Sequence, residues 1–348
     1  MQSLCDHDVE SLAKLFASWG FKAVQAGKLL RAFYEGDGEI DWQELRLGKQ
    51  LQTKIESEIK LLSSRLLTTR TSVDGTSKFL LGFDRGGAVE CVLMPAYDPT
   101  RAAGCVSSQI GCAMGCDFCA STKSGLERDL EAGEIVEQFL ILRRRASASG
   151  RRLSTLVFMG MGEPMHNLDN VTAAVRRIAS PQMGNLGFRN ITISTVGIIP
   201  GIEQLADADL NVHLALSLHA PDDATRSRIV PTGRKFGVRD IVAAARRFQE
   251  RTGRVVNIEY CLLEGVNDHD EQAHALADLM EGFRAHVNLI PYNPIGPGLS
   301  GAIYRTPSPA KISGFGQILR SRGVVAHIRR TRGDDVSAAC GQLREMMA

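Results

Sequence analysis

The densest group of chemically reactive side chains in the sequence is a set of four cysteines between residues 105 and 119. Cys105 comes first, and Cys112, Cys116 and Cys119 follow at the spacing C-x3-C-x2-C. Three thiolates at this spacing can bind three irons of a [4Fe-4S] cluster, whereas full protein ligation usually takes four cysteines. The motif therefore predicts a cluster with one iron left open to a ligand from outside the protein.

A structural zinc site is the alternative interpretation of these cysteines. Cys105 would then supply the fourth ligand that structural zinc requires. Zinc ribbons, however, usually present two separated C-x2-C pairs, and this stretch contains one such pair, formed by Cys116 and Cys119. The spacing therefore favours the iron–sulfur cluster over zinc.

Composition limits the class of protein further. The chain has 348 residues, of which 44% are hydrophobic and 23% charged, and its net charge is +2. These values are typical of a folded globular protein, and they leave any binding of nucleic acid to local basic clusters. No apolar run approaches the roughly 20 residues that cross a bilayer, and the N-terminus lacks the pattern of a secretory signal. We expect a monomeric, cytoplasmic protein with reduced cysteines and no membrane association.

The pattern of hydrophobic residues divides the chain into three predicted regions. Residues 1–60 have helical periodicity and predict a helical accessory domain. Residues 61–100 contain strand-like runs around a turn at Asp84–Gly87 and predict a β extension. Across residues 101–348, short β-branched runs alternate with helix-like stretches about six times. This alternation predicts an α/β fold with a parallel sheet, arranged as a partial (β/α)6 TIM-like barrel.

Polar or glycine-rich motifs stand where several of these predicted strands end. In barrels of this kind the chemistry lies at the C-terminal ends of the strands. We therefore expect these motifs to meet at one mouth of the barrel, although they lie far apart in the sequence. The positions are Gly160–Pro164, Ser194, Thr195, Ser217, His219 and Asn293.

The cysteine motif, with Phe118 directly before its last cysteine, resembles the radical S-adenosylmethionine (SAM) enzymes. The surrounding motifs make the resemblance more specific, because together they are similar to the RlmN/Cfr family of RNA adenosine methyltransferases and closer to RlmN. The similarity extends in the family's order from about residue 90 to residue 343. The motifs are "CVSSQIGCAMGCDFC", "GMGEP", "ISTVGIIP", "LSLHAP", "NLIPYNP" and "TRGDDVSAACGQL".

The resemblance implies a set of cofactor-binding residues. Cys112, Cys116 and Cys119 would hold a [4Fe-4S] cluster, and the open iron would bind SAM. A carboxylate at Glu163 can accept hydrogen bonds from the charged amino group of SAM. Without the family context, His219 would more often be a structural histidine. The implied SAM contacts are Gly162, Glu163, Ser194, Ser217, Leu218, His219 and Asn293.

Three further residues acquire catalytic roles from the resemblance. Cys340 matches the family's methyl-carrying cysteine, Cys105 its second catalytic cysteine, and Glu90 a glutamate that accepts a proton. A free cysteine in such a chain is otherwise most often a small buried hydrophobic residue. We expect that role for the remaining cysteines, Cys5, Cys91 and Cys261.

The implied activity is methylation of carbon 2 of adenosine in 23S rRNA and in tRNA, with two molecules of SAM per turnover. Cys340 takes a methyl group from the first SAM by nucleophilic displacement. A 5′-deoxyadenosyl radical from the second SAM activates that methyl group, which then joins the adenine. Glu90 removes the ring proton, and Cys105 releases the product by forming a disulfide with Cys340. The cluster would receive its electron from a donor such as flavodoxin.

Basic residues suggest where RNA would bind. The run from His327 to Asp335 leads directly into the Cys340 segment, so it is the patch that we favour for phosphate contacts. For Arg143–Arg145, Arg151–Arg152 and Arg246–Arg247 we expect solvated helix faces. In the family the N-terminal helical domain also helps to seat RNA.

The sequence leaves three alternative functions open. The first is the carbon-8 adenosine methyltransferase of the same family, a Cfr-type enzyme that confers antibiotic resistance. The second is a zinc-stabilised RNA-binding protein without catalysis, which would leave the "GMGEP", "LSLHAP" and Cys340 motifs unexplained. The third is a radical SAM enzyme that acts on a substrate other than RNA, against which the "AACGQL" motif argues.

Overall fold

A ten-stranded sheet organises the chain, and the computed structural model describes residues 2–231 and 235–343 of it. The strand order is β14-β13-β12-β11-β10-β9-β6-β5-β4-β3. Strands β9 to β14 run parallel to one another and β6 is parallel to β9, whereas the pairs β3–β4, β4–β5 and β5–β6 are antiparallel. The strands are β3 (Ser64–Thr71), β4 (Ser77–Phe83), β5 (Ala88–Pro95), β6 (Arg101–Cys105), β9 (Arg152–Phe158), β10 (Ile191–Thr195), β11 (His213–Ser217), β12 (Val256–Leu262), β13 (Ala285–Pro291) and β14 (Val325–Ile328).

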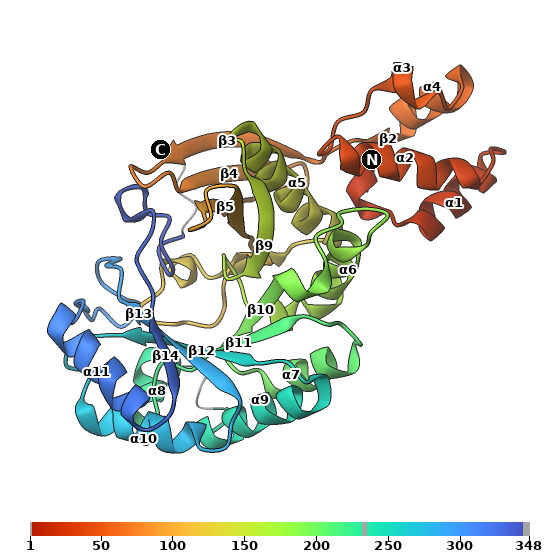
Figure 1. Cartoon of the computed structure of the whole chain (residues 1–348). Helices are drawn as coiled ribbons and strands as arrows, with labels where there is room; N and C mark the ends of the chain where they lie inside the picture. The colour runs from red at the N-terminus through yellow and green to blue at the C-terminus, as the bar shows by residue number, and fades with distance from the viewer. Residues whose placement is uncertain (1, 232–234, 344–348) are drawn as a thin grey trace.

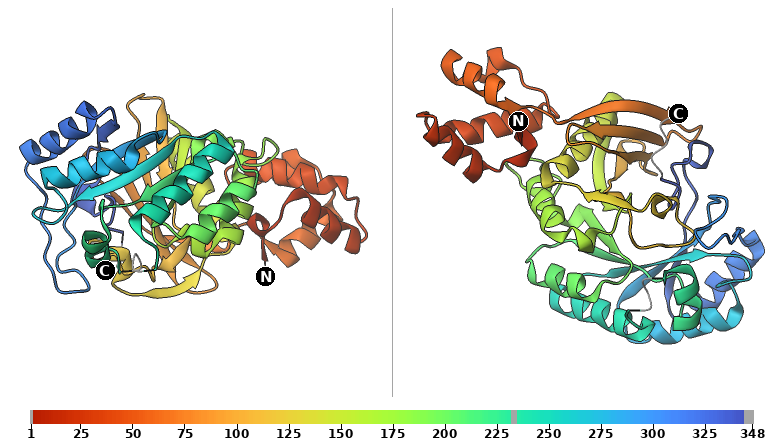
Figure 2. Two further views of the ribbon diagram at one scale, coloured as in Figure 1. Left: turned by 90° about the horizontal axis from the view of Figure 1, so that it is seen from below. Right: turned by 180° about the vertical axis from the view of Figure 1, so that it is seen from behind.

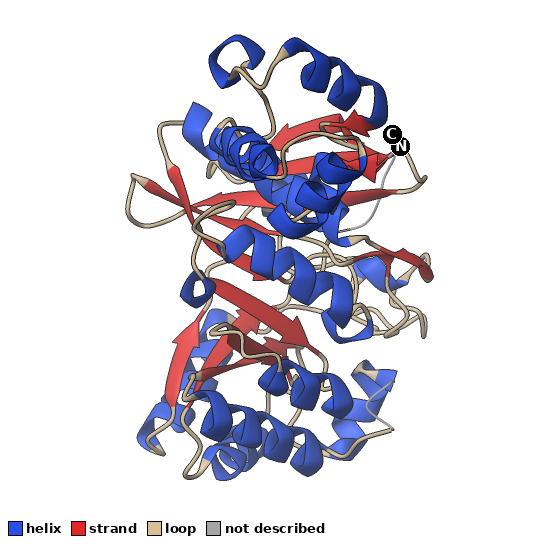
Figure 3. Ribbon diagram, turned by 90° about the vertical axis from the view of Figure 1, so that its right-hand side faces the viewer, coloured by secondary structure: helices blue, strands red, loops and turns tan. Residues whose placement is uncertain are grey.

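Helices connect the parallel strands and cover the outer face of the curved sheet (Figures 1 and 3). Strand β6 and each strand from β9 to β13 lead into at least one helix before the next parallel strand, which confirms the predicted partial (β/α)6 barrel. The helices are α5 (Ala132–Ala148), α6 (Leu168–Ala179), α7 (Ile199–Asp207), α8 (Asp223–Ile229), α9 (Val238–Thr252), α10 (Asp270–Met280) and α11 (Pro309–Ser321).

Helix α6 shows why these segments fold as they do. Its buried residues recur every three or four positions, so they form one apolar stripe against the sheet. Arg176 and Arg177 lie in its last turn, where positive charge is favourable next to the exposed carbonyl groups. Strand β12 differs, because it is buried along almost its whole length, as is typical of a central parallel strand.

The N-terminal helices form a separate bundle beside the barrel (Figure 2). They are α1 (Val9–Ser18), α2 (Val24–Glu35), α3 (Trp42–Leu45) and α4 (Lys49–Glu58). Glu137 on α5 fixes the chain that leaves this bundle, because its carboxylate accepts hydrogen bonds from the N–H groups of Ser63 and Ser64. Arg143 on the same helix pairs with Asp37 of the bundle. No helix in the described part of the chain is long and apolar enough to span a membrane.

The segment that follows β14 bridges the two edges of the sheet. Strands β14 and β3 are the edge strands, and the chain passes from the first toward the hairpin of β3 and β4 (Figure 1, dark blue). There the N–H of Gly333 donates to Asp74 at 3.2 Å, and Asp335 accepts from the N–H of Val73 at 3.1 Å. The open side of the barrel is therefore closed by a loop, and this loop carries Cys340.

Candidate active site

The loop after β6 holds three of the four clustered cysteines in a tight turn. The N–H of Cys112 donates to the carbonyl of Gly125 at 2.9 Å, and Thr122 donates its hydroxyl to the carbonyl of Cys119 at 2.9 Å. Gly111 has a φ of +74°, and a Cβ there would lie 1.9 Å from the Gly125 oxygen, so only glycine fits. The sequence thus bends the loop so that all three cysteines line one cavity.

This cavity, which we call the cofactor cavity, has a volume of about 910 Å³ including the part open to solvent. It lies at the C-terminal ends of strands β9 to β13, as the sequence predicts. Of the residues singled out in the sequence, those lining it are Cys112, Cys116, Phe118, Cys119, Gly160, Gly162, Glu163, Ser194, Thr195, Ser217, His219, Cys261 and Cys340. Leu218 and Asn293 are buried beside it and do not line it, and neither do Cys105 and Glu90.

The three cysteines fit an iron–sulfur cluster better than a single metal ion. Among the residues with described positions, no three His, Cys, Asp or Glu side chains are grouped to hold one metal ion. A [4Fe-4S] cluster makes a different demand, because each cysteine binds a different iron. Burial raises the pKa of Cys112 to about 12 and raises that of Cys116 and Cys119 as well. Bound iron would supply the positive charge that lets these thiols ionise.

Glu163 is fully enclosed and bonded to the main chain. Its two carboxylate oxygens accept hydrogen bonds from the N–H groups of Val196 at 2.8 Å and Met165 at 3.1 Å. Burial nevertheless raises its pKa to about 7. Gly162 before it has a φ of +100°, and a Cβ there would lie 2.6 Å from Gln109. This packing presents the carboxylate to the cavity, where a cationic amino group would favour its ionised form.

His219 is a neutral hydrogen-bond donor with a fixed tautomer. Its Nδ1 accepts a hydrogen bond from the N–H of Cys261 at 3.0 Å, so the proton resides on Nε2. Burial, together with the charge of Arg226, lowers its pKa to about 3. Its ring meets that of Phe118 edge-on at 4.8 Å between centroids. His219 therefore also supports the cysteine loop, on which Phe118 lies.

Glu259 is a residue of this cavity that the sequence analysis missed. It lies on β12, in register with Ser217 on one side and Asn288 on the other. Oε1 accepts a hydrogen bond from Asn288 at 2.8 Å, while Oε2 is buried without a partner among the described residues. Burial raises its pKa. A single acidic residue in the apolar run "VNIEYCL" was the available signal.

Cys340 lies on a loop that is docked against the cysteine loop. Asn293 donates to the carbonyl of Cys340 at 3.1 Å, and the N–H of Ala120 donates to the carbonyl of Gly341 at 2.7 Å. The residue as a whole is exposed, yet it lines the cofactor cavity, and desolvation raises the pKa of its thiol. We conclude that the thiol faces the cavity and that the exposed surface belongs to the rest of the loop.

Cys105 lies close to Cys340 although it does not line the cofactor cavity. It is in register with Val92 of β5, so both side chains point to the same face of the sheet. Glu90, two residues before Val92, shares that face. Burial raises the pKa of Cys105 to about 12, and Cys340 is the second cause. The structure therefore brings Cys105, Cys340 and Glu90 to one side of the β extension.

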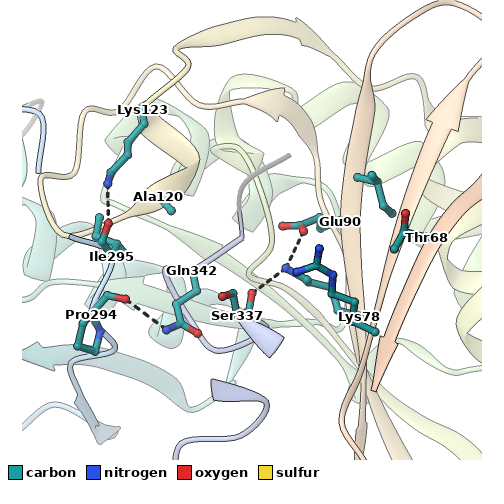
Figure 4. A pocket seen from close by; sticks show the side chains of 11 residues that line it. Thr68, Lys78, Glu90, Ala120, Lys123, Pro294, Ile295, Ser337 and Gln342 are labelled. Atoms are coloured by element: carbon teal, nitrogen blue, oxygen red, sulfur yellow. Dashed lines mark hydrogen bonds and ion pairs between the residues drawn. The ribbon is translucent and has the colours of Figure 1, made fainter. Parts of the chain in front are cut away.

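Glu90 lines a second cavity, shown in Figure 4, which we call the outer cavity. Its volume is about 880 Å³ including the part open to solvent, and it lies on the other side of the Cys340 loop. Nζ of Lys78 is 2.7 Å from Oε1 of Glu90 and donates to the carbonyl of Ser337 at 3.0 Å. Ser337 and Gln342 line the outer cavity, whereas Cys340 and Gly341 line the cofactor cavity. The loop thus separates the two.

The basic clusters differ partly from expectation. Arg143 is not on a solvated helix face, because its side chain is only 20% exposed and pairs with Asp37 of the helical bundle. The sequence could not show this partner, which lies about a hundred residues away. Arg247 pairs with Glu203 on the outer helices. In the favoured patch, Arg332 donates to the carbonyl of Pro95 at 2.6 Å and stacks on Tyr97.

Comparison with known proteins first defines the class. Residues 106–277 match the family model of the radical SAM superfamily. A radical SAM methyltransferase from Sphaerobacter thermophilus superposes with a TM-score of 0.93 and 40% identity over 99% of both chains. The hydrogenase maturase HydG, at 14% identity and a TM-score of 0.51, shares the fold. The chain is therefore a radical SAM protein, and this class implies a [4Fe-4S] cluster and SAM as cofactors.

Sequence relatives then define the family. The chain is 52% identical over 342 residues to a probable dual-specificity RNA methyltransferase RlmN 1 from Opitutus terrae, which covers 98% of this chain and 96% of the relative. It is 42% identical over 344 residues to the ribosomal RNA large subunit methyltransferase N of Nitrosopumilus maritimus, covering 96% of each chain. The chain belongs to the RlmN family, which confirms the resemblance found in the sequence.

Proposed function

We propose that the protein methylates carbon 2 of a specific adenosine in 23S rRNA and in tRNA, through a methyl group carried on Cys340. The names of its relatives support an RNA methyltransferase. The observation that carries the proposed role of Cys340 is the position of its loop, which lies between the cofactor cavity and the cavity of Glu90. The choice of carbon 2 rests on the similarity of "TRGDDVSAACGQL" to the RlmN branch. A residue placed there can take a methyl group on one side and deliver it on the other.

The residues of the cofactor cavity fit the implied cofactors. Cys112, Cys116 and Cys119 would hold the cluster, and Glu163 would accept from the amino group of SAM. Gly162, Ser194, Ser217 and His219 would line the rest of the SAM site, with Leu218 and Asn293 behind them. When bound, the cluster and SAM would supply a 5′-deoxyadenosyl radical that accepts a hydrogen atom, together with a one-electron acceptor for the later oxidation, and no side chain provides such chemistry.

The first step of the proposal is an ordinary displacement at Cys340. The thiol must lose its proton, and burial opposes this, so the thiolate forms when the positive charge of SAM is present. Its sulfur then bonds to the methyl carbon as the bond from that carbon to the sulfonium breaks. Because the thiol faces the cofactor cavity, this step needs no RNA.

The later steps use the residues on the other side of the loop. After the methyl-derived carbon has joined carbon 2, the ring hydrogen leaves as a proton to Glu90, which Lys78 holds at 2.7 Å. The Cys105 thiolate then attacks the sulfur of Cys340. A disulfide forms, the bond from Cys340 to the transferred carbon breaks, and this carbon takes up a proton to become the methyl group of the product. A second SAM is consumed in each turnover.

The outer cavity suits the target nucleotide. Leu80, Pro294 and Ile295 offer apolar surface for a base, and Arg70 and Lys123 offer positive charge for its phosphate. We further propose that residues 1–60 form an RNA-binding domain, that 61–100 link it to the barrel of 101–348, and that the protein works as a cytoplasmic monomer reduced by a donor such as flavodoxin.

One experiment tests the proposed product directly. Anaerobically reconstituted protein is incubated with SAM, a reductant and unmodified 23S rRNA or tRNA, and the nucleosides are compared with 2-methyladenosine and 8-methyladenosine standards by mass spectrometry. We expect 2-methyladenosine from both RNAs. A dominant 8-methyl product would place the activity with the carbon-8 enzymes, and protein with stoichiometric zinc and no visible absorption would refute the radical route.

A further inference from the structure

Arg226 on α8 is an unusual residue, because its charge is buried without a matching acid. It is 1% exposed, and it is the largest of the fully buried side chains in the described part of the protein. Nε donates to the carbonyl of Leu218 at 3.0 Å, and Nη2 donates to the carbonyl of Val196. Nη1 is buried and has no partner among the described residues, and in that part of the chain Arg226 forms no ion pair. Since arginine stays charged in proteins, its site contains a buried cation without an ion-pair partner among the described residues.

A buried cation of this kind is costly unless a negative group offsets it. The carboxylate of Asp223, on the same helix, acts on Arg226 only at a distance, and it accepts a hydrogen bond from the N–H of Val238 at 2.6 Å. The acceptors that Arg226 itself contacts among the described residues are neutral main-chain carbonyls. No carboxylate there forms an ion pair with the guanidinium, so a bound negative group beside it would complete the compensation.

The packing of α8 shows where that group would lie. The N–H of Asp117 donates to the carbonyl of Ile229 at 2.9 Å, and Cys116 packs against Ile229 and Val230 in one apolar cluster. The last turn of α8 thus rests on the turn that contains Cys116. Nη2 of Arg226 also donates to the carbonyl of Ser217 at 3.4 Å, and Val196 and Ser217 both line the cofactor cavity. The guanidinium therefore lies directly behind the wall of that cavity.

We infer that Arg226 is the counter-ion of the iron–sulfur cluster and raises the potential at which the cluster accepts its electron. Three thiolates on a [4Fe-4S] cube give a net negative charge, and reduction adds another. A buried positive charge with an unpartnered N–H group behind the wall of the cofactor cavity favours the reduced state, because cluster potentials depend on net charge and on hydrogen bonds to the sulfurs. The inference rests on the proposed function only in requiring that the cluster binds.

The test is a redox titration of reconstituted protein followed by electron paramagnetic resonance. Arg226→Gln removes the charge and keeps a polar side chain of related shape, and Arg226→Lys keeps the charge. Arg228→Met is the matched control, because Arg228 lies on the same helix with an exposed side chain. We expect Arg226→Gln to lower the potential by at least about 59 mV, a tenfold change for one electron. We expect the potential of Arg226→Lys to lie close to that of the wild type. We expect Arg228→Met to have the wild-type potential.

Several outcomes would overturn the inference. A wild-type potential in Arg226→Gln would do so, and so would an equal shift in the Gln and Lys variants, because packing alone would then explain it. If Arg226→Gln failed to fold even without iron, Arg226 would be needed for the fold itself and the counter-ion role would be wrong. If it folded but no longer retained iron, while Arg226→Lys did, the role would be supported. A wild-type protein that binds no cluster would instead refute the proposed function.

Discussion

The two cavities on either side of the Cys340 loop are built by different principles. The cofactor cavity lies at the ends of barrel strands, and its titratable side chains are enclosed and bonded to the main chain, as in Glu163 and His219. The outer cavity lies between the β extension and the C-terminal segment, and it retains charges, with Arg70, Lys78 and Lys123 against one carboxylate. The first can exclude water around reactive species, and the second can meet a polyanion.

This contrast teaches how the protein can separate two kinds of chemistry. Radical steps need enclosure, whereas proton transfer and RNA binding need charges close to solvent. The Cys340 loop contacts both cavities, because Asn293 and Ala120 hold it on one side and Lys78 holds it on the other. Changes in the cofactor cavity should therefore stop the radical steps, whereas changes in the outer cavity should stop proton transfer or RNA binding.

The largest effect is expected from the cluster ligands. Cys112→Ala should abolish retention of the [4Fe-4S] cluster and lower RNA methylation more than a thousandfold, because the radical source is lost. Iron analysis and the visible spectrum measure the first effect, and nucleoside mass spectrometry measures the second. Cys261→Ala is the matched control, since Cys261 lines the same cavity and should leave the iron content unchanged. Full iron in Cys112→Ala would contradict the ligand assignment.

A large but selective effect is expected from Glu90. Glu90→Gln should lower RNA methylation by about 10²- to 10⁴-fold, which is the usual contribution of a positioned general base. Methylation of Cys340 by SAM should continue at the wild-type rate, because it takes place in the other cavity. Intact-protein mass spectrometry follows that step. If both steps fell together, Glu90 would act on the structure of the loop and not on the proton.

A moderate effect is expected from the positive charges of the outer cavity. Lys123→Met should weaken RNA binding about tenfold, since a charge-assisted contact contributes roughly 1.5 kcal/mol or more. The slope of log affinity against log salt should fall by about one. Lys311→Met, which removes a charge from the outer helix α11, should change neither. An unchanged salt slope in Lys123→Met would mean that RNA phosphate does not reach this cavity.

The smallest effect concerns the attachment of the C-terminal segment. Hydrogen bonds from Ser72 and Val73 lower the pKa of Asp335. A carboxyl group with a lowered pKa stabilises the folded state above its ordinary value near 3.9, and the stabilisation is lost as the pH falls through the lowered value. Hydrogen exchange at the Val73 amide in apo protein should therefore accelerate below about pH 4, after correction for the intrinsic rate. In Asp335→Asn this dependence should vanish.

The sequence predicted those features that depend on local spacing. The cysteine motif and the alternation of strands and helices are local patterns, so the barrel and the three cysteines of the cofactor cavity could be foreseen. Arg226 could not, because it is one of three charged residues in the short helix α8 and only the fold shows which of them is buried. Glu259 stood out as the one acid in an apolar strand, but that signal alone does not assign it to the cavity. The division into two cavities depends on Lys78 meeting Ser337, which lie 259 positions apart, and only the folded chain brings them together.

The relay between Cys340 and Cys105 is the central claim, and one comparison of variants tests it most directly. Each variant is incubated with SAM, a reductant and RNA, and then analysed on a denaturing gel for nuclease-sensitive protein–RNA complexes. Cys105→Ala should accumulate a covalent adduct and yield less than one product per enzyme, because no thiolate resolves the link. Cys340→Ala should form no adduct while retaining the cluster. Cys91→Ala, a buried cysteine on the opposite face of β5, should turn over as the wild type does. Normal turnover by Cys105→Ala, or the same adduct in Cys340→Ala, would contradict the relay.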